Sequence, residues 1–314
     1  MPATPNQVVI ATRESALALW QARYVRSLLQ ERVPGLDVSL LGMTTEGDRR
    51  LEVSLAKIGG KGLFVKELEQ ALYDGRADIA VHSMKDVPME LPAGFHLAAM
   101  IAREEPRDAF VSNDFKDLQS LPPASVVGTS SLRRQSQIRA RFPELVVKPL
   151  RGNVQTRLRK LDEGGFAAII LAAAGLKRLS LQHRITGLLE PEESLPAVGQ
   201  GALGIECRED RMDLRELLAF LDHAPTRCCV EAERTLSRAL AGSCNVPLGG
   251  YAQLLGDRMR LRGFVATADG SRLLEDDLTM PFTDTVPETI GRDMARRLTR
   301  RGAREILDAQ ELDA

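Results

Sequence analysis

Two side chains are the first candidates for reactive groups, Asp86 and Cys244. Asp86 follows Lys85 directly after the apolar run 78–83, and Pro88 restricts the backbone just after it and favours a sharp turn. A carboxylate held in this way can stabilise positive charge or transfer a proton. Taken alone, an aspartate beside a lysine at the end of a strand is more often a solvated ion pair.

The chain has four cysteines, and their settings differ. Cys207 lies in a strand-like run and Cys229 on an apolar helical face, which favours the core for both. Cys244 lies in the Gly-Ser-Cys-Asn-Val-Pro turn, the more exposed setting that a nucleophile needs. Since no C-x-x-C spacing occurs, and Cys228 directly precedes Cys229, we expect neither a disulfide framework nor a metal site.

Arginines follow three of the predicted strands. Arginine grips carboxylates with a planar pair of donors, so its position after strands matters more than its number. In an open α/β sheet, ligands bind beyond the carboxyl ends of the strands. These groups therefore predict one anion-binding site, with a solvated basic surface as the alternative. The three strand-end groups are Arg13 with Ser15, Thr129, Ser130 and Ser131 with Arg133 and Arg134, and Arg151 and Gly152 with Arg157.

The elements that must position these residues follow a strand–helix rhythm. Strands that are apolar on both faces are typical of a mainly parallel sheet covered by helices, and two consecutive units of this kind predict two similar lobes. The run 202–208 is predicted to cross back and complete the first lobe. We expect α/β architecture in three domains: 1–101 with 202–220, 102–201 with the arginine-rich sites, and 221–314 with Cys244.

A charged, glycine-containing stretch at 44–62 has no sustained pattern and predicts a mobile loop over the cleft. Lys57, Lys61 and Phe64 are its expected contacts with the ligand.

Composition excludes several classes of protein. The net charge is -1, aromatics make up 4% of the residues, and no basic stripe interleaves them, so nucleic acid is not expected as a partner. No apolar run approaches the roughly 18 residues of a membrane span, and no signal-peptide pattern opens the chain. We expect a cytoplasmic protein, as a monomer. The run 199–204 fits G-x-G-x-x-G, but it precedes a strand instead of linking a strand to a helix, which argues against a dinucleotide site.

Several segments, which follow one another in the family's order along the chain, resemble the porphobilinogen deaminase family. Members of this family are also called hydroxymethylbilane synthases. The resemblance covers nearly the whole chain. The segments are GGKGLFVKELE at 59–69, ADIAVHSMKDVP at 77–88, GTSSLRRQ at 128–135, LRGNVQTRL at 150–158, LPAVGQGALGIECR at 195–208 and the cysteine turn at 242–247. The chain departs from the family pattern at Glu14, Ser136, Ser243 and Asn245.

The resemblance implies two lobes like those of type II periplasmic solute-binding proteins, with a third domain that carries the cofactor cysteine. It implies a transferase that condenses four porphobilinogens into hydroxymethylbilane for haem biosynthesis. The cofactor would be a dipyrromethane joined by a thioether to Cys244, and Asp86 would be the catalytic carboxylate. Thr129, Ser130 and Gly152 join the expected substrate- and cofactor-binding set, which the resemblance places at Arg13, Ser15, Lys85, Ser131, Arg133, Arg134, Arg151, Arg157 and Arg178.

Two other functions remain open at this level. One is a two-lobed protein that captures a small acidic solute and does no chemistry. The other is a conventional thiol enzyme acting through Cys244, although the sequence shows no evident histidine partner for that thiol.

Overall fold

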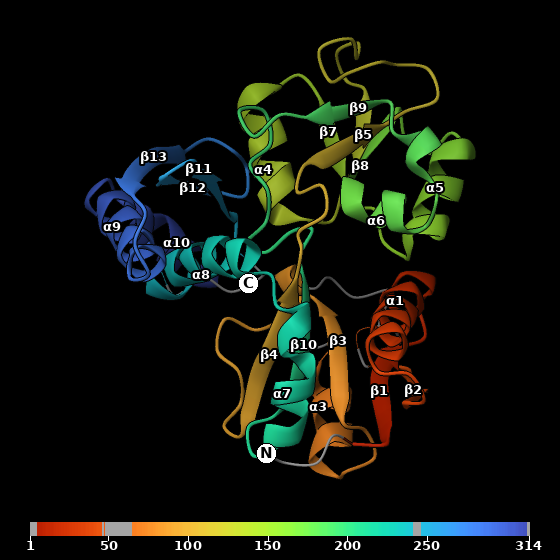
Figure 1. Ribbon diagram of the computed structural model, residues 1–314. Coiled ribbons are helices and arrows are strands. Elements are labelled where there is room, and N and C mark those ends of the chain that lie inside the picture. The colour runs from red at the N-terminus through yellow and green to blue at the C-terminus, as the bar shows by residue number, and fades with distance from the viewer. Residues whose placement is uncertain (1–4, 46, 48–64, 241–245, 313–314) are drawn as a thin grey trace.

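The computed structural model describes residues 5–45, 47, 65–240 and 246–312, and Figure 1 shows their arrangement in two lobes and a C-terminal domain. Most of the predicted loop, with Lys57, Lys61 and Phe64, lies outside the described residues, and so does Cys244.

Lobe 1 is built on a five-stranded sheet with the strand order β2-β1-β3-β10-β4. Strands β2, β1 and β3 pair in parallel, and β10 runs antiparallel between β3 and β4. Its elements are β1 (Gln7–Arg13), α1 (Ala16–Arg32), β2 (Asp37–Met43), α3 (Lys66–Tyr73), β3 (Ile79–Ser83), the 3-10 helix η2 (Met84–Asp86), β4 (Phe95–Ile101), β10 (Leu203–Arg208), α7 (Met212–Leu218) and the 3-10 helix η4 (Ala219–Leu221).

Lobe 2 repeats this pattern with the strand order β7-β6-β8-β5-β9. Strands β7, β6 and β8 pair in parallel, and β5 runs antiparallel between β8 and β9. Its elements are β5 (Asp108–Val111), β6 (Val126–Gly128), α4 (Leu132–Arg141), β7 (Val146–Lys148), α5 (Val154–Asp162), β8 (Ala168–Ala172), α6 (Ala173–Arg178), the 3-10 helix η3 (Gln182–Arg184) and β9 (Gly187–Leu189).

The chain passes between the lobes twice, and each passage supplies the antiparallel strand of the sheet that it enters. β5 is the first strand after the chain leaves lobe 1, and β10 is the first after it leaves lobe 2. The return of 202–208 to the first sheet is therefore as predicted. The residue-level domain boundaries stay predictions. Strands β5 and β9 were absent from the sequence prediction, because both are short and neither is followed by a helix, so the strand–helix pattern that indicated β6, β7 and β8 is missing there.

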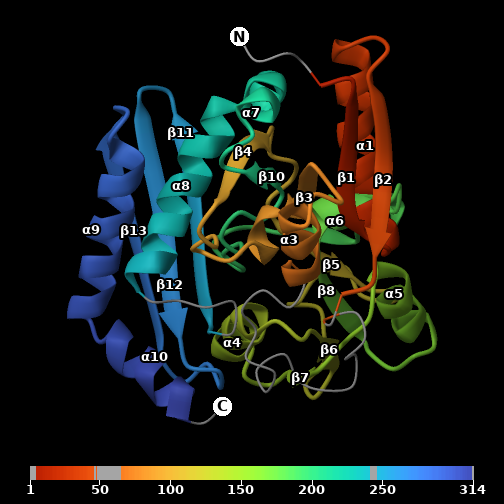
Figure 2. The same ribbon diagram turned by 90° about the horizontal axis from the view of Figure 1, so that it is seen from below.

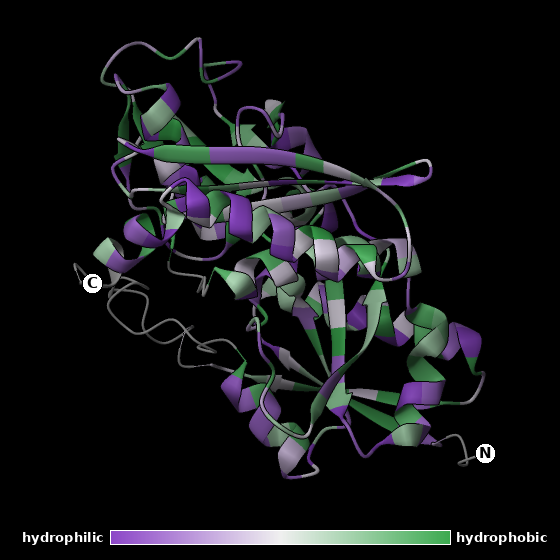
Figure 3. Cartoon of the chain, turned by 90° about the vertical axis from the view of Figure 1, so that its left-hand side faces the viewer, coloured by the Kyte–Doolittle hydropathy of each residue, from purple (hydrophilic) through white to green (hydrophobic). Residues whose placement is uncertain are grey.

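The C-terminal domain packs helices on one face of an antiparallel three-stranded sheet. Leu236, Met294 and Leu298 are fully buried where α8 and α9 cover the sheet. In Figure 3 hydrophilic and hydrophobic residues alternate along the helices, as expected when one face of each is buried. The elements are α8 (Ala224–Ala239), β11 (Leu248–Leu255), β12 (Arg258–Ala266), β13 (Leu273–Pro281), α9 (Val286–Arg300) and α10 (Ala303–Leu312).

One buried ion pair ties this domain to both passages between the lobes. Arg103 follows β4 and donates to Glu233 of α8 over 2.6 Å and to the backbone oxygen of Gln200 over 2.7 Å. Glu233 also accepts from the backbone N–H groups of Gly199 and Ala252. The predicted α/β fold with two lobes and a small third domain is confirmed. Among the described helices, none has the length and apolar character needed to cross a membrane.

Candidate active site

A cleft of about 710 Å³ lies between the lobes, at the carboxyl ends of their parallel strands. Figures 1 and 2 show α5 and α6 of lobe 2 on the same side of the molecule as α1 and β1 of lobe 1. Among the described residues that line the cleft, seven are basic and only two, Glu14 and Asp86, are acidic. The cleft therefore carries a positive potential suited to a polyanion.

Asp86 reaches the cleft from η2, the single turn that ends β3. The turn is fixed by Met84, which is fully buried and accepts the N–H of Val87, while Val87 takes the extended conformation expected before Pro88. Asp86 itself is exposed. The carboxylate is thus presented to the cleft from a rigid base.

Lys85 lines the cleft beside Asp86, and its surroundings disfavour the charged form of its side chain. Burial lowers the pKa of Lys85 to about 8, and the nearby charges of Arg134 and Arg157 lower it further, while Asp86 acts in the opposite direction. An anion bound beside this ammonium group would raise the pKa again, because it favours the charged form.

The start of α5 contributes the densest group of cations. Asn153 caps the helix by accepting the N–H of Thr156 over 2.9 Å, and Gly152 has φ 114°, a conformation that favours glycine. Arg157 donates to the Gly152 carbonyl over 2.8 Å. Burial, with the charges of Arg134 and Arg151, lowers the pKa of Arg157 to about 10. The helix N-terminus and these side chains together favour an anion.

Lobe 1 faces this group with Arg13 and Ser15. Both residues line the cleft at the end of β1, and Ser15 also caps α1 by accepting the N–H of Ala18. From lobe 2, Arg178 at the end of α6 donates to the Gly201 carbonyl over 2.6 Å. Its guanidinium group lies over the ring of Trp20 of α1, 5.9 Å from the centroid, so it touches both lobes. Burial lowers the pKa of Arg178 to about 10.

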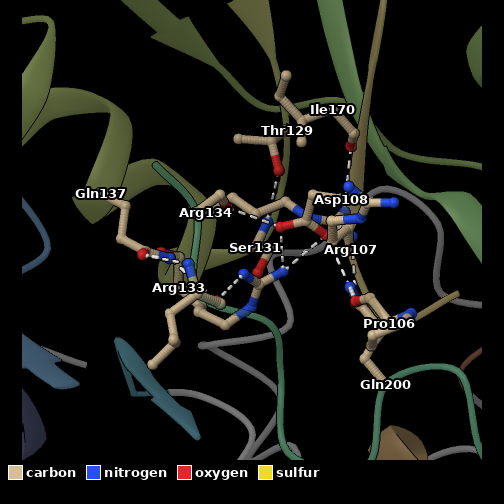
Figure 4. A network of polar contacts seen from close by, with 12 residues as sticks. Pro106, Arg107, Asp108, Thr129, Ser131, Arg133, Arg134, Gln137, Ile170 and Gln200 are labelled. Carbon is tan, nitrogen blue, oxygen red and sulfur yellow. Dashed lines mark hydrogen bonds and ion pairs between the residues drawn. The ribbon is translucent and has the colours of Figure 1, made fainter. Parts of the chain in front are cut away.

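The consecutive arginines of α4 both bind Asp108 at the start of β5, as Figure 4 shows. Arg133 donates to Asp108 over 2.8 Å and to the Leu195 carbonyl, and Arg134 donates to Asp108 over 2.7 Å. Burial alone would raise the pKa of Asp108, but the two guanidinium charges and hydrogen bonds from Arg134 and Gln200 hold it well below its usual value. Only Arg134 also lines the cleft.

The structure separates the predicted binding residues into three groups. Thr129, Ser131 and Arg133 do not line the cleft: Thr129 is buried and accepts the N–H of Ser131, and Arg133 is held by Asp108. Cys244 and the predicted loop contacts lie outside the described residues. The residues that do line the cleft are Arg13, Ser15, Lys85, Asp86, Ser130, Arg134, Arg151, Gly152, Arg157 and Arg178.

Lys160 and Gln200 also line the cleft and were not predicted. Lys160 lies three residues after Arg157 on α5, hence on the same helical face, and this spacing could have indicated it. Gln200 lies on the passage between the lobes and donates to Asp108, for which the sequence has no local signal.

The three described cysteines are poor nucleophiles. Burial raises the pKa of Cys207 to about 11 and that of Cys229 to about 12, and it also raises the pKa of Cys228. Each of these thiols therefore stays protonated at neutral pH.

Family models place the chain among known proteins. The model described as "Porphobilinogen deaminase, dipyromethane cofactor binding domain" matches residues 8–216, and "Porphobilinogen deaminase, C-terminal domain" matches residues 227–300. The chain belongs to the porphobilinogen deaminase family. Its relatives include proteins named porphobilinogen deaminase from Nitrosomonas europaea, 65% identical over 98% of this chain and 99% of the relative, and from Methylobacillus flagellatus, 62% identical over 97% and 98%.

Among solved structures, a putative methionine-binding lipoprotein from Bacillus subtilis is similar at 12% identity, with a TM-score of 0.43, over 70% of this chain and 92% of that one.

The cleft suits the cofactor of the porphobilinogen deaminase family. A dipyrromethane built from two porphobilinogens carries four carboxylates, and buried carboxylates need partners of opposite charge. The lining offers such partners from both lobes: Arg13, Lys85, Arg134, Arg151, Arg157, Lys160 and Arg178.

Proposed function

We propose that this chain condenses four porphobilinogen molecules head to tail into hydroxymethylbilane, with release of four ammonia. A dipyrromethane attached by a thioether to Cys244 is its cofactor. The observation that carries the proposal is the excess of basic over acidic side chains in one cleft that also presents Asp86.

The basic residues hold the carboxylates of the cofactor and the substrate. Each porphobilinogen brings an acetate and a propionate, so every addition adds two negative charges to the cleft. Burial and mutual repulsion already lower the pKa values of Lys85 and Arg157. Binding of carboxylates relieves this repulsion, which makes the cleft selective for an acidic oligomer.

Asp86 stabilises positive charge during each condensation. When porphobilinogen loses ammonia, the C–N electron pair leaves with nitrogen and the remaining pyrrole becomes an electron-poor cation. A fixed carboxylate near such a cation contributes roughly 3–4 kcal/mol, the magnitude seen for preorganised charge stabilisation. When bound, the dipyrromethane supplies the pyrrole ring to which the first substrate is joined.

Further assignments belong to this proposal. Thr129, Ser131 and Arg133 act indirectly, by holding the turn before α4 and the Asp108 network, and Lys57, Lys61 and Phe64 contact the ligand from the loop before α3. We also infer a cytoplasmic monomer that binds no nucleic acid.

Intact-protein mass spectrometry tests the covalent cofactor. Wild type should carry an adduct with the mass of two linked pyrroles and consume porphobilinogen with release of ammonia. Cys244→Ser should lose both the adduct and the activity. Cys228→Ser is the matched control, because Cys228 is a half-buried thiol outside the cleft, and it should keep both.

The outcomes separate the alternatives. A wild-type protein without an adduct that binds porphobilinogen unchanged would be a two-lobed binding protein. Turnover that needs Cys244 without any pyrrole adduct would indicate a conventional thiol enzyme.

A further inference from the structure

A buried acid–base pair in lobe 1 joins two paired strands, one of which leads to Asp86. The Nε2 atom of His82 on β3 lies 2.8 Å from Oε2 of Glu206 on β10, and their side chains are 4% and 0% exposed. Burial of an ionisable pair is costly and often less stabilising than apolar packing. A cost of this kind favours a functional role for the pair over a purely structural one.

Glu69 of α3 is the third member of this cluster. Helix α3 lies beside β3 and β10 in Figures 1 and 2, and it contacts both strands. Within the described part of the chain, Oε1 of Glu69 and Oε1 of Glu206 are both buried without a hydrogen-bond partner. Burial, reinforced by the negative charge of Glu206, raises the pKa of Glu69 to about 7. Glu69 is only half-buried, so part of its side chain is in contact with solvent.

A small side chamber brings this cluster next to the cleft. The chamber has a volume of about 60 Å³ and is lined by His82, Leu68 and Val81, among others. Asp86 and Arg13 line both the chamber and the cleft. A polar cavity of this size has room for at least one water molecule. The chamber therefore joins His82 to the lining of the cleft by a space that a water molecule can occupy.

The reaction that we propose for the cleft produces a proton at each condensation. The C–N bond of porphobilinogen breaks and ammonia leaves with the electron pair. A carbon–carbon bond then forms between the methylene group and the α-carbon of the accepting pyrrole. The aminomethyl group enters as an ammonium group and leaves as ammonia, so the proton that the α-carbon must then lose to restore aromaticity stays behind in the cleft. Asp86 can accept the proton but must return to its ionised form before the next addition.

We propose that His82, Glu206 and Glu69 form a proton-exit path that restores the Asp86 carboxylate after each condensation. His82 takes the proton from Asp86 through the side chamber, Glu206 orients His82 and shares its proton, and Glu69 releases it to solvent. This inference rests on the proposed function. His82, Glu206 and Glu69 act through Asp86, because they return its carboxyl group to the ionised form.

The charged groups around the path lie on four elements. They are Glu206 on β10, Glu69 and Lys66 on α3, Arg13 on β1 and Asp86 on η2. Lys66 and His82 lower the pKa of Glu69, against burial and Glu206. The near-neutral value is the balance of these effects.

Steady-state kinetics over a range of pH test the path. His82→Gln keeps a hydrogen-bond donor for Glu206 but cannot carry a proton. It should lower kcat by about 100-fold, which is the lower end of general acid–base contributions, and leave KM close to the wild-type value. The drop should be accompanied by a larger solvent deuterium isotope effect and an intact pyrrole adduct. His183→Gln is the matched control, because His183 is exposed on lobe 2, and it should change none of these.

Glu69→Gln keeps the test decisive if His82→Gln fails to fold. Wild-type kcat should fall below about pH 7, where Glu69 becomes protonated and can no longer accept a proton, and Glu69→Gln should lose this inflection. Glu31→Gln, an exposed helical position of lobe 1, should keep it. A folded, adduct-bearing His82→Gln or Glu69→Gln protein with the wild-type kcat profile would overturn the path.

A titration independent of activity separates this inference from the proposed function. In cofactor-free Cys244→Ser protein, carbon-13 NMR of the glutamate carboxyls should show one group that titrates near pH 7 and disappears in Glu69→Gln. Its absence would overturn the path even if the enzyme turns over. A wild-type protein without adduct or turnover would instead overturn the proposed function.

Discussion

The guanidinium group of Arg134 is held by Asp108, to which Nη2 donates over 2.7 Å and Nε over 3.0 Å, while the same side chain lines the cleft. Asp108 lies at the start of the strand that enters lobe 2 from the passage between the lobes. It therefore fixes an arginine of the cleft in one orientation. Arg133 binds the same carboxylate but does not line the cleft, so we expect substitutions of these two consecutive arginines to have different effects.

Asp108→Asn should be strongly destabilising. It leaves the buried guanidinium groups of Arg133 and Arg134 without a counter-charge, and removing one partner of a buried ion network costs about 3–5 kcal/mol. Urea unfolding of the cofactor-free protein measures this loss. Asp162→Asn is the control, because the Asp162–Arg184 pair is largely exposed and should be worth less than about 1 kcal/mol. Equal losses in the two variants would contradict the buried-network account.

Arg133→Lys and Arg134→Lys should separate stability from catalysis. Lysine cannot make the paired hydrogen bonds of arginine, so each change weakens the Asp108 network. Only Arg134→Lys also alters the cleft, and loss of one charge-assisted hydrogen bond to a carboxylate should lower kcat/KM by about 10-fold or more. Arg133→Lys should leave kcat/KM nearly unchanged. The reverse order would show that Arg133 contacts the ligand.

The sequence predicted the parallel framework because its strands are apolar and most of them are followed by a helix. β3 lies within the apolar run 78–83, and the arginines at 151 and 157 reach the cleft from the predicted strand-to-helix turn. Local rules suffice here, since the carboxyl ends of parallel strands meet at one edge.

Ion pairs and hydrogen bonds between residues far apart in the sequence could not be predicted from local patterns. A buried carboxylate such as Asp108 has no local pattern, and its partners Arg133 and Gln200 lie far along the chain, so Arg133 was assigned to the ligand. Backbone conformation and close packing explain the glycines of the G-x-G-x-x-G run. Gly201 has φ 90°, and a Cβ atom at this position would lie 2.4 Å from the Glu104 carbonyl oxygen. Its glycines allow the passage between the lobes to approach neighbouring backbone closely.

Asp86→Asn should abolish most of the turnover without unfolding the protein. The amide keeps the size of the side chain but loses the charge that stabilises the cationic pyrrole, so kcat should fall by about 10²–10³-fold. Since Asp86 is exposed to the cleft, the melting temperature should stay near that of wild type. Asp114→Asn, an exposed change on lobe 2, is the control and should keep full activity. Wild-type kcat in Asp86→Asn would remove this carboxylate from the mechanism.

Glu69→Gln should stabilise the protein at alkaline pH while it slows the enzyme. The folded state raises the pKa of Glu69 from 4.5 to about 7, so folding favours the protonated carboxyl group. Between pH 4.5 and about 7 the folded state binds more protons than the unfolded chain, so the free energy of unfolding falls as the pH rises through this interval. Glutamine cannot ionise and avoids this loss.

The free energy of unfolding of Glu69→Gln should exceed that of wild type by about 1 kcal/mol at pH 8. This difference is smaller than the whole pKa shift implies, because solvent screens the half-buried group. It should vanish near pH 4. Urea unfolding of the cofactor-free protein at both pH values measures it, with Glu31→Gln as the control that should show no pH-dependent difference. A Glu69→Gln protein that is less stable than wild type at pH 8 would show that folding does not disfavour the ionised carboxylate, so that the pKa of Glu69 is not raised. The protein would then lack the near-neutral carboxyl group on which proton exit from the cleft depends.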